Sequence, residues 1–138
     1  MAHLLRCMML DLYECNREKL LEVNFIEKHM RIAAEKTGAT VIGCSFHTFE
    51  PWGVSGTVTI SESHLAVHTW PEYDFAAISI ETCGQNIDPK KAAYYLIIVF
   101  NSKRSTINEF KRGEFKSSSE KNLPHKIINS PFMQIPST

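Results

Sequence analysis

Alternation of apolar and polar residues along the chain predicts most of its strands. Successive side chains of a strand point to opposite faces, so alternation marks a strand with one buried face. On this basis we expect strands over residues 4–13, 39–49, 54–60, 64–70, 74–83 and 104–111. Two stretches instead repeat apolar residues at helical spacing, from about residue 24 to 36 and from Asp88-Pro89 to Phe100, and Asn16 resembles a helix cap. These elements predict an α+β fold, a two-layer sandwich of an antiparallel sheet with helices on one face.

The expected strands also agree on which residues share a face. Their apolar faces carry Ile42, Cys44 and Phe46, then Val54, Val58 and Ile60, then Leu65, Val67 and Thr69, and finally Ala76, Ile78 and Ile80. If these strands join one sheet, the opposite faces together carry Phe49, Ser55, His68 and Cys83. This convergence of aromatic, hydroxyl, imidazole and thiol groups indicates a functional site. Because that face is also partly apolar, something must cover it.

Length and charge narrow the class of protein. The chain has 138 residues, enough for one domain with a real core. We expect this domain over residues 1–113 and a flexible polar tail over residues 114–138. Lys and Arg balance Asp and Glu, which gives no electrostatic case for binding nucleic acid or a membrane surface. With no apolar run long enough to span a membrane and no signal-peptide layout, we expect a cytoplasmic protein whose four cysteines are reduced thiols.

The middle of the chain concentrates reactive side chains in a stretch that otherwise resembles a strand. Between Thr59 and Glu72 it holds two serines, two carboxylates and two histidines. On these residues alone, a half-buried strand with solvated histidines explains the pattern as well as a functional site does.

The exact order of residues in this stretch, however, is specific to one family. Ser-Glu-Ser-His-Leu-x-x-His-Thr-Trp-Pro-Glu, over residues 61–72, resembles the self-processing site of the small, prokaryotic, pyruvoyl-dependent type of S-adenosylmethionine decarboxylase. Further blocks resemble the same family in the same order, and these are Tyr13-Glu14-Cys15, Phe46-His47, Gly53-Val54-Ser55-Gly56, Glu81-Thr82-Cys83-Gly84 and Ile87-Asp88-Pro89. The resemblance covers roughly residues 4–112.

The resemblance implies that the chain cuts itself between Glu62 and Ser63. In this family the serine hydroxyl attacks the preceding carbonyl, the ester that forms is lost by β-elimination, and the remaining dehydroalanine hydrolyses to a pyruvoyl group. The pyruvoyl ketone forms a Schiff base with the substrate amine and draws electrons during decarboxylation, so neither a metal nor pyridoxal phosphate is implied. The implied activity is decarboxylation of S-adenosylmethionine to the aminopropyl donor for spermidine biosynthesis.

The same resemblance implies roles for five further residues. His68 would be the proton shuttle during processing, Cys83 would return a proton to the substrate carbon, and Ser55 would assist processing. Phe49 would stack on the adenine ring and Glu72 would bind the ribose. Taken alone, four of these residues have simpler explanations: His68 as a solvated histidine, Cys83 as a structural cysteine, Phe49 as a core ring and Glu72 as a loop carboxylate.

Strand parity separates Ser63 from His68. The two residues are an odd number of positions apart, so on one flat strand they face opposite sides of the sheet. Either the chain kinks at Ser63, or the His68 that serves Ser63 belongs to another protomer. The resemblance favours the second possibility, a homodimer with sites between the protomers, which would also cover the open face of the sheet.

Two departures from the family pattern leave alternatives open. Many relatives have Gly-Arg-His where this chain has Leu5-Arg6-Cys7, and Glu where it has Asp11. These departures put substrate fit in doubt, so a pyruvoyl decarboxylase that acts on arginine or ornithine stays open, as does an unprocessed, non-catalytic partner subunit. A last alternative is a metal protein that uses His47, His64, His68 and Cys83 as ligands. The spacing of these four residues matches no known ligand cluster.

Overall fold

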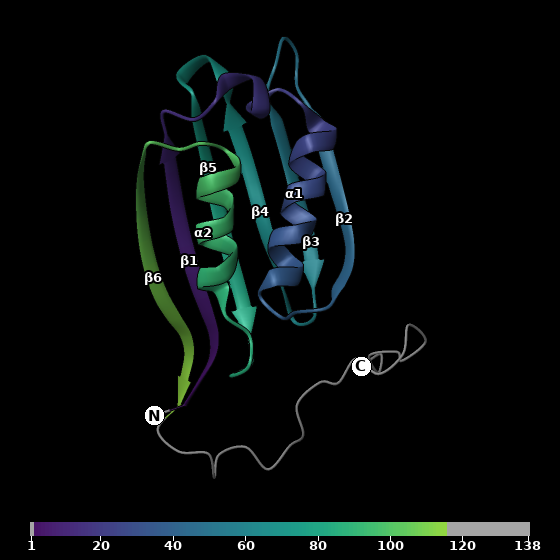
Figure 1. The fold of residues 1–138 in the computed structure, drawn as a ribbon. Helices are drawn as coiled ribbons and strands as arrows, with labels where there is room; N and C mark the ends of the chain where they lie inside the picture. The colour runs from purple at the N-terminus through teal and green to yellow at the C-terminus, as the bar shows by residue number, and fades with distance from the viewer. Residues whose placement is uncertain (1, 116–138) are drawn as a thin grey trace.

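One antiparallel sheet carries both α-helices on the same face (Figure 1). The structure is a computed structural model that describes residues 2–115. Within that range the elements, in chain order, are β1 (Ala2–Tyr13), the 3-10 helix η1 (Arg17–Leu20), α1 (Val23–Lys36), β2 (Val41–Thr48), β3 (Val54–Ile60), β4 (Ser63–Trp70), the 3-10 helix η2 (Pro71–Tyr73), β5 (Phe75–Cys83), α2 (Pro89–Val99) and β6 (Arg104–Phe115). The predicted α+β two-layer fold is therefore confirmed.

The strands do not lie in the order in which they follow one another along the chain. Within residues 2–115 the sheet has six strands in the order β2-β3-β4-β5-β1-β6. The first strand of the chain is thus inserted between two of the last, and Figure 1 shows β1 between β5 and β6. All neighbouring pairs are antiparallel, with Leu10 opposite Ile78 in the β1–β5 pair and Leu65 opposite Ile80 in the β4–β5 pair.

The core lies between the helices and the covered face of the sheet. The predicted alternation is confirmed in β3, β4 and β5, where the residues expected to face the core are buried while the residues between them are not. Each helix contributes one apolar stripe, and the buried residues are Ile26, Met30, Ala33 and Ala34 in α1 and Pro89, Ala92, Ala93 and Leu96 in α2. Because complete burial of a leucine or isoleucine contributes roughly 1.5–3 kcal/mol, this layer fixes which face of the sheet stays open.

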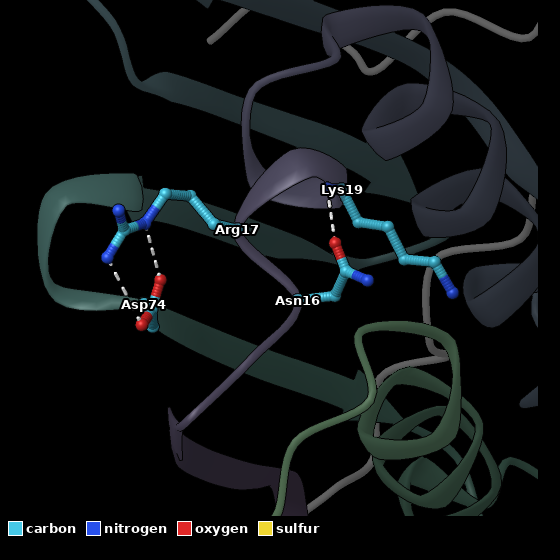
Figure 2. A network of polar contacts seen from close by, with 4 residues as sticks. All are labelled: Asn16, Arg17, Lys19 and Asp74. Carbon is cyan, nitrogen blue, oxygen red and sulfur yellow. Dashed lines mark hydrogen bonds and ion pairs between the residues drawn. The ribbon is translucent and has the colours of Figure 1, made fainter.

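At the start of two helices a side chain accepts a hydrogen bond from the backbone, at the predicted helix start Asp88 and at the predicted cap Asn16. The Asp88 carboxylate accepts a hydrogen bond from the Lys90 backbone N–H at 3.0 Å, and α2 begins at the next residue, Pro89. The Asn16 side chain likewise accepts from the Lys19 backbone N–H at 3.3 Å, but the helix it caps is only the short η1. Figure 2 shows this cap beside the ion pair of Arg17 with Asp74, in which Arg17 Nε donates to Oδ1 at 2.8 Å. The pair ties η1 to the turn that follows η2.

The structure differs from the sequence expectations at two places. Ile42 was expected on the apolar face of its strand, but a register shift between Val41 and Gly43 breaks the alternation there and leaves Ile42 54% exposed. β6 continues to Phe115, two residues into the segment predicted as a tail. The rest of that segment lies outside the described residues. No helix within residues 2–115 is both long and apolar enough to cross a membrane, and the four cysteines form no disulfide with one another.

Candidate active site

The face of the sheet away from the helices carries the predicted functional side chains. Ser55, His68 and Cys83 occupy the positions of β3, β4 and β5 that alternate with buried core residues. The structure divides them between two groups at different heights along the strands. We call these the Ser63 cluster and the His68 cluster.

The Ser63 cluster surrounds the predicted cut. A two-residue turn, Ser61 and Glu62, connects β3 to β4, and Ser63 is the first residue of β4. Glu62 has a φ of 68°, in the left-handed region that residues with side chains seldom adopt and that costs roughly 1–2 kcal/mol. Its carboxylate Oε2 accepts a hydrogen bond from the Cys83 thiol at 2.9 Å, so this predicted proton donor contacts the side chain of the residue that precedes the predicted cut.

Glu81 is the hub of this cluster. Its Oε1 accepts a hydrogen bond from the Ser63 hydroxyl at 3.0 Å, while its Oε2 accepts from the Cys7 thiol and from Arg112 Nη1, each at 2.9 Å. The Ser63 cluster thus consists of Cys7, Glu62, Ser63, Glu81, Cys83 and Arg112. It draws on β1, β4, β5, β6 and the β3–β4 turn.

The contacts within this cluster set the protonation of two of its members. The hydrogen bond from Cys7 is the largest influence on Glu81, and together with those from Ser63 and Arg112 it holds the pKa of the Glu81 carboxyl below its usual value. Burial, reinforced by the neighbouring Glu81, raises the pKa of the Cys7 thiol to about 11. The cluster therefore holds an ionised carboxylate and a protonated Cys7 thiol at neutral pH.

The His68 cluster lies further along the same face and consists of Ser55, His68 and the rings of Trp70, Phe75 and Tyr13. Ser55 Oγ and His68 Nδ1 share a hydrogen bond of 2.7 Å between β3 and β4. Beside this pair the rings follow one another across the sheet, with centroid separations of 6.3 Å from His68 to Trp70, 5.7 Å from Trp70 to Phe75 and 5.1 Å from Phe75 to Tyr13. Ser55 and His68, which were predicted to share one face of the sheet, are thus in contact within one chain.

The two clusters do not meet within one chain. On β5, Glu81 is opposite His64 whereas Ala77 is opposite His68. Four residues of strand correspond to roughly 13 Å at about 3.3 Å per residue. Ser63 keeps its register opposite Ile60, so the strand does not kink out of the sheet, yet its hydroxyl reaches Glu81. The neighbour of Ser63 in its own chain is therefore a carboxylate and not an imidazole.

The other two predicted residues, Phe49 and Glu72, are exposed and lie just beyond the ends of β2 and β4. Phe49 follows β2, is 49% exposed and meets the His47 ring edge-on at a centroid distance of 4.7 Å. Glu72 lies exposed in η2, directly after the strand that carries His68. Among residues 2–115 no three His, Cys, Asp or Glu side chains are placed to hold a metal ion, so the four candidate metal ligands do not form a site.

Sequence reasoning missed three members of the Ser63 cluster. Cys7 was noted only as a departure, and Glu81 only as part of a matching block. Both lie on the open face, and their Cα positions are paired between β1 and β5. Arg112 comes from β6, whose place beside β1 no short-range pattern reveals.

Known proteins of one family are similar to this chain in sequence and in fold. The family model described as S-adenosylmethionine decarboxylase matches residues 6–113. Proteins named S-adenosylmethionine decarboxylase proenzyme are 45% identical in Fervidobacterium nodosum, over 98% of this chain and 99% of the relative, and 48% identical in Thermosipho melanesiensis, over 92% and 98%. The crystal structure of the adenosylmethionine decarboxylase from Aquifex aeolicus superposes with a TM-score of 0.79 at 29% identity, covering 84% of this chain and 96% of that one. The chain therefore belongs to the S-adenosylmethionine decarboxylase family.

Proposed function

We propose that the chain cuts itself between Glu62 and Ser63, and that the cut protein decarboxylates S-adenosylmethionine by means of a pyruvoyl group derived from Ser63. The name shared by the relatives supports both halves of this proposal, because it gives a decarboxylase for the reaction and a proenzyme for a precursor that must be processed. None of the relatives described above is named as a decarboxylase of arginine or ornithine, or as a non-catalytic subunit.

The observation that carries the proposal is the conformation of the Glu62–Ser63 junction. Glu62 is held in the left-handed region, where strain accumulates at functional sites. Ser63 follows it directly, half-buried, with its hydroxyl hydrogen-bonded to a carboxylate. A nucleophile fixed next to the carbonyl that it must attack gains on the order of 7–11 kcal/mol from proximity alone. The residues present therefore fit a serine that is converted to a pyruvoyl group.

The side chains around Ser63 suit the reaction that would follow. A pyruvoyl group supplies a ketone that reacts with amines and withdraws electrons from the bond to the departing carboxylate. Cys83 hydrogen-bonds to Glu62 next to the proposed cut, which supports a role for its thiol in returning a proton to the substrate. Phe49 offers an exposed ring for stacking on adenine, and Glu72 offers an exposed carboxylate for a ribose diol.

We further propose that two copies pair through their open faces as a homodimer. Exposed apolar side chains on that face need cover, among them Met9, Trp70 and Phe110. A two-fold axis that lies between two facing sheets and runs across their strands would reverse the strand direction of the second copy. His68 of one protomer would then lie over the Ser63 end of the other, which would bring together the two clusters that a single chain keeps apart.

Intact mass under denaturing conditions tests the cut directly. We expect two pieces from freshly purified protein, one spanning residues 1–62 and one that begins with a pyruvoyl group in place of Ser63. The variant S63A, which lacks the attacking hydroxyl, should remain one chain of 138 residues. A wild-type chain that stays whole would contradict the proposal.

A substrate panel tests the activity. Release of labelled carbon dioxide should be faster from S-adenosylmethionine than from arginine or ornithine, and S63A should release none. A preference for either amino acid would reassign the enzyme to the second pyruvoyl-dependent activity. A cut protein that decarboxylates none of the three would refute the proposed reaction while leaving the cut established.

A further inference from the structure

We propose that Glu81 is the base for the first step of self-cleavage, and that Cys7 and Arg112 hold its carboxylate in position for this step. This role rests on the proposed cut at Ser63, because it concerns the acyl shift that begins it. Neither Cys7 nor Arg112 touches the reacting atoms, so both are positioning residues, whereas Glu81 contacts the attacking oxygen.

The two oxygens of Glu81 have different partners. Oε1 accepts the hydrogen bond from Ser63 at 3.0 Å, and Oε2 accepts the two bonds from Cys7 and Arg112 at 2.9 Å. Because the two donors come from different strands, β1 and β6, the carboxylate is fixed on the side away from Ser63. The remaining oxygen is therefore aimed at the hydroxyl whose proton must leave. A candidate base within about 2.6–3.2 Å of the proton that it removes meets the geometric requirement.

The charges around Glu81 keep it able to accept that proton. The groups that face it are Cys7 on β1, Arg112 on β6, and Ser63 and His64 on β4. Their hydrogen bonds and positive charge favour the ionised carboxylate, and its pKa is lowered accordingly. A carboxylate of low pKa is a weak base. A weak base suffices here, since each chain cuts itself once and needs no rapid turnover.

The step balances with groups that the chain itself provides. As Ser63 Oγ forms a bond to the Glu62 carbonyl carbon, the hydroxyl proton passes to Glu81 Oε1. When the C–N bond between Glu62 and Ser63 then breaks, the departing nitrogen takes that proton back. The products are an ester and a free amine, Glu81 returns to its ionised form, and no outside reactant is consumed.

This assignment divides the work of processing between two groups. His68 of the same chain lies roughly 13 Å along the strand from the Ser63 cluster, beyond the reach of a direct proton transfer. Glu81 serves the acyl shift within its own chain. A partner's imidazole, if the proposed dimer forms, is left for the elimination that follows.

Cleavage of newly made protein tests the proposal. The full-length precursor is synthesised with radiolabelled methionine in a cell-free system, and conversion to the two pieces is followed with and without hydroxylamine, which cleaves the ester as soon as it forms. In wild type, hydroxylamine should accelerate cutting. The rate of the acyl shift should not change between pH 8 and pH 5, because Glu81 stays ionised over that range. E81Q should slow ester formation roughly 100-fold or more even with hydroxylamine present, the usual range for loss of a general base.

Further variants separate a base from a structural residue. E81D retains a carboxylate and should cut faster than E81Q, although more slowly than wild type. R112Q should slow cutting by several-fold. E109Q is the matched control, because it exchanges the same residue type and breaks another ion pair between β1 and β6, that of Glu109 with Arg6 at 2.7 Å, yet it should cut at the wild-type rate.

Each outcome has one meaning. If wild type never cuts, the proposed function fails together with this inference. If wild type cuts and folded E81Q forms the ester at the same rate, only the role of Glu81 is refuted. Should E81Q not fold, as judged by circular dichroism, E81D decides, because a shortened side chain that leaves the rate unchanged would show that Ser63 does not depend on contact with this carboxylate.

Discussion

Gly56 should be the position of the sheet that least tolerates an added methyl group. It lies on the covered face of β3, directly opposite Phe46 of β2, and the Phe46 ring occupies the space where a side chain of residue 56 would be. A Cβ at this position would come within 2.0 Å of the ring carbon Cδ2, and two more ring carbons would lie within 2.5 Å. G56A therefore cannot be accommodated by a small adjustment.

The expected loss of stability follows from this clash. Because ordinary contact begins near 3.4 Å, the Phe46 ring must move by more than an ångström and give up part of its packing against the core. Overpacking typically costs about 1–3 kcal/mol, and partial loss of an aromatic contact adds about 1 kcal/mol. We expect G56A to lower the free energy of unfolding by about 2–4 kcal/mol, which for a chain of this length corresponds to a Tm lower by roughly 8–16 °C.

The assay is urea unfolding at one fixed protein concentration in the S63A background, where the chain stays whole. G43A is the matched control, since a Cβ at Gly43 on the neighbouring strand would meet nothing within 4 Å, and it should change stability by less than about 0.5 kcal/mol. In an F46A background the cost of G56A should largely disappear. If G56A alone is as stable as its parent, or if removal of the ring does not rescue it, the reasoning is wrong.

Three further predictions concern individual side chains. Among residues 2–115, the buried Thr82 hydroxyl has no hydrogen-bond partner. Replacing it in T82V should therefore raise the free energy of unfolding, measured in urea, by about 1 kcal/mol. A lower stability of T82V would show that the hydroxyl does have a hydrogen-bond partner. Cys7, with a pKa of about 11, should react with iodoacetamide at pH 8 on the order of 100-fold more slowly than a cysteine in a short peptide; equal rates by peptide mass spectrometry would contradict the buried environment. Because the folded-state pKa of Glu81 is lowered, its contribution to stability is present above the unfolded-state pKa of about 4.3 and is lost as pH falls through the folded value. The difference in free energy of unfolding between S63A and S63A with E81Q should accordingly become smaller on acidification below about pH 4. A difference that grows instead would show that the pKa of Glu81 is raised in the folded state.

Local patterns were sufficient to predict the sheet faces and the helices. The buried alternation of Leu65 and Val67 in β4, and the cap that begins α2 at Asp88, depend on side chains within a few residues of one another. The prediction that Ser55 and His68 share a face needed only the parity of two neighbouring strands. Ile42 was assigned to the wrong face because a β-bulge shifts the register by one residue. The adjacent Gly43 is the local signal for that bulge, since an isolated glycine within a strand pattern often marks one.

The contacts around Ser63 could not be predicted from local sequence patterns, because they depend on strands that are far apart in the sequence. Glu81 is paired with Cys7 across 74 positions of sequence and with Arg112 across 31. Those pairings exist only because β1 lies between β5 and β6, and strand order depends on how the whole chain packs. The left-handed conformation of Glu62 is equally hidden, since glutamate has no preference for it.

The insertion of β1 between β5 and β6 would determine how the two pieces of the protein stay together after the proposed cut. The first piece would contain β1, β2 and β3, and the second would contain β4, β5 and β6. The two pieces would therefore be joined by hydrogen bonds along three strand boundaries, β3–β4, β5–β1 and β1–β6. The pieces would stay together without a covalent link for as long as the sheet persists. Once melted, however, they would have to find each other again by diffusion, at a rate that depends on concentration. The working enzyme would thus be a state reached only by way of its precursor, and its useful lifetime would be governed by how slowly it unfolds.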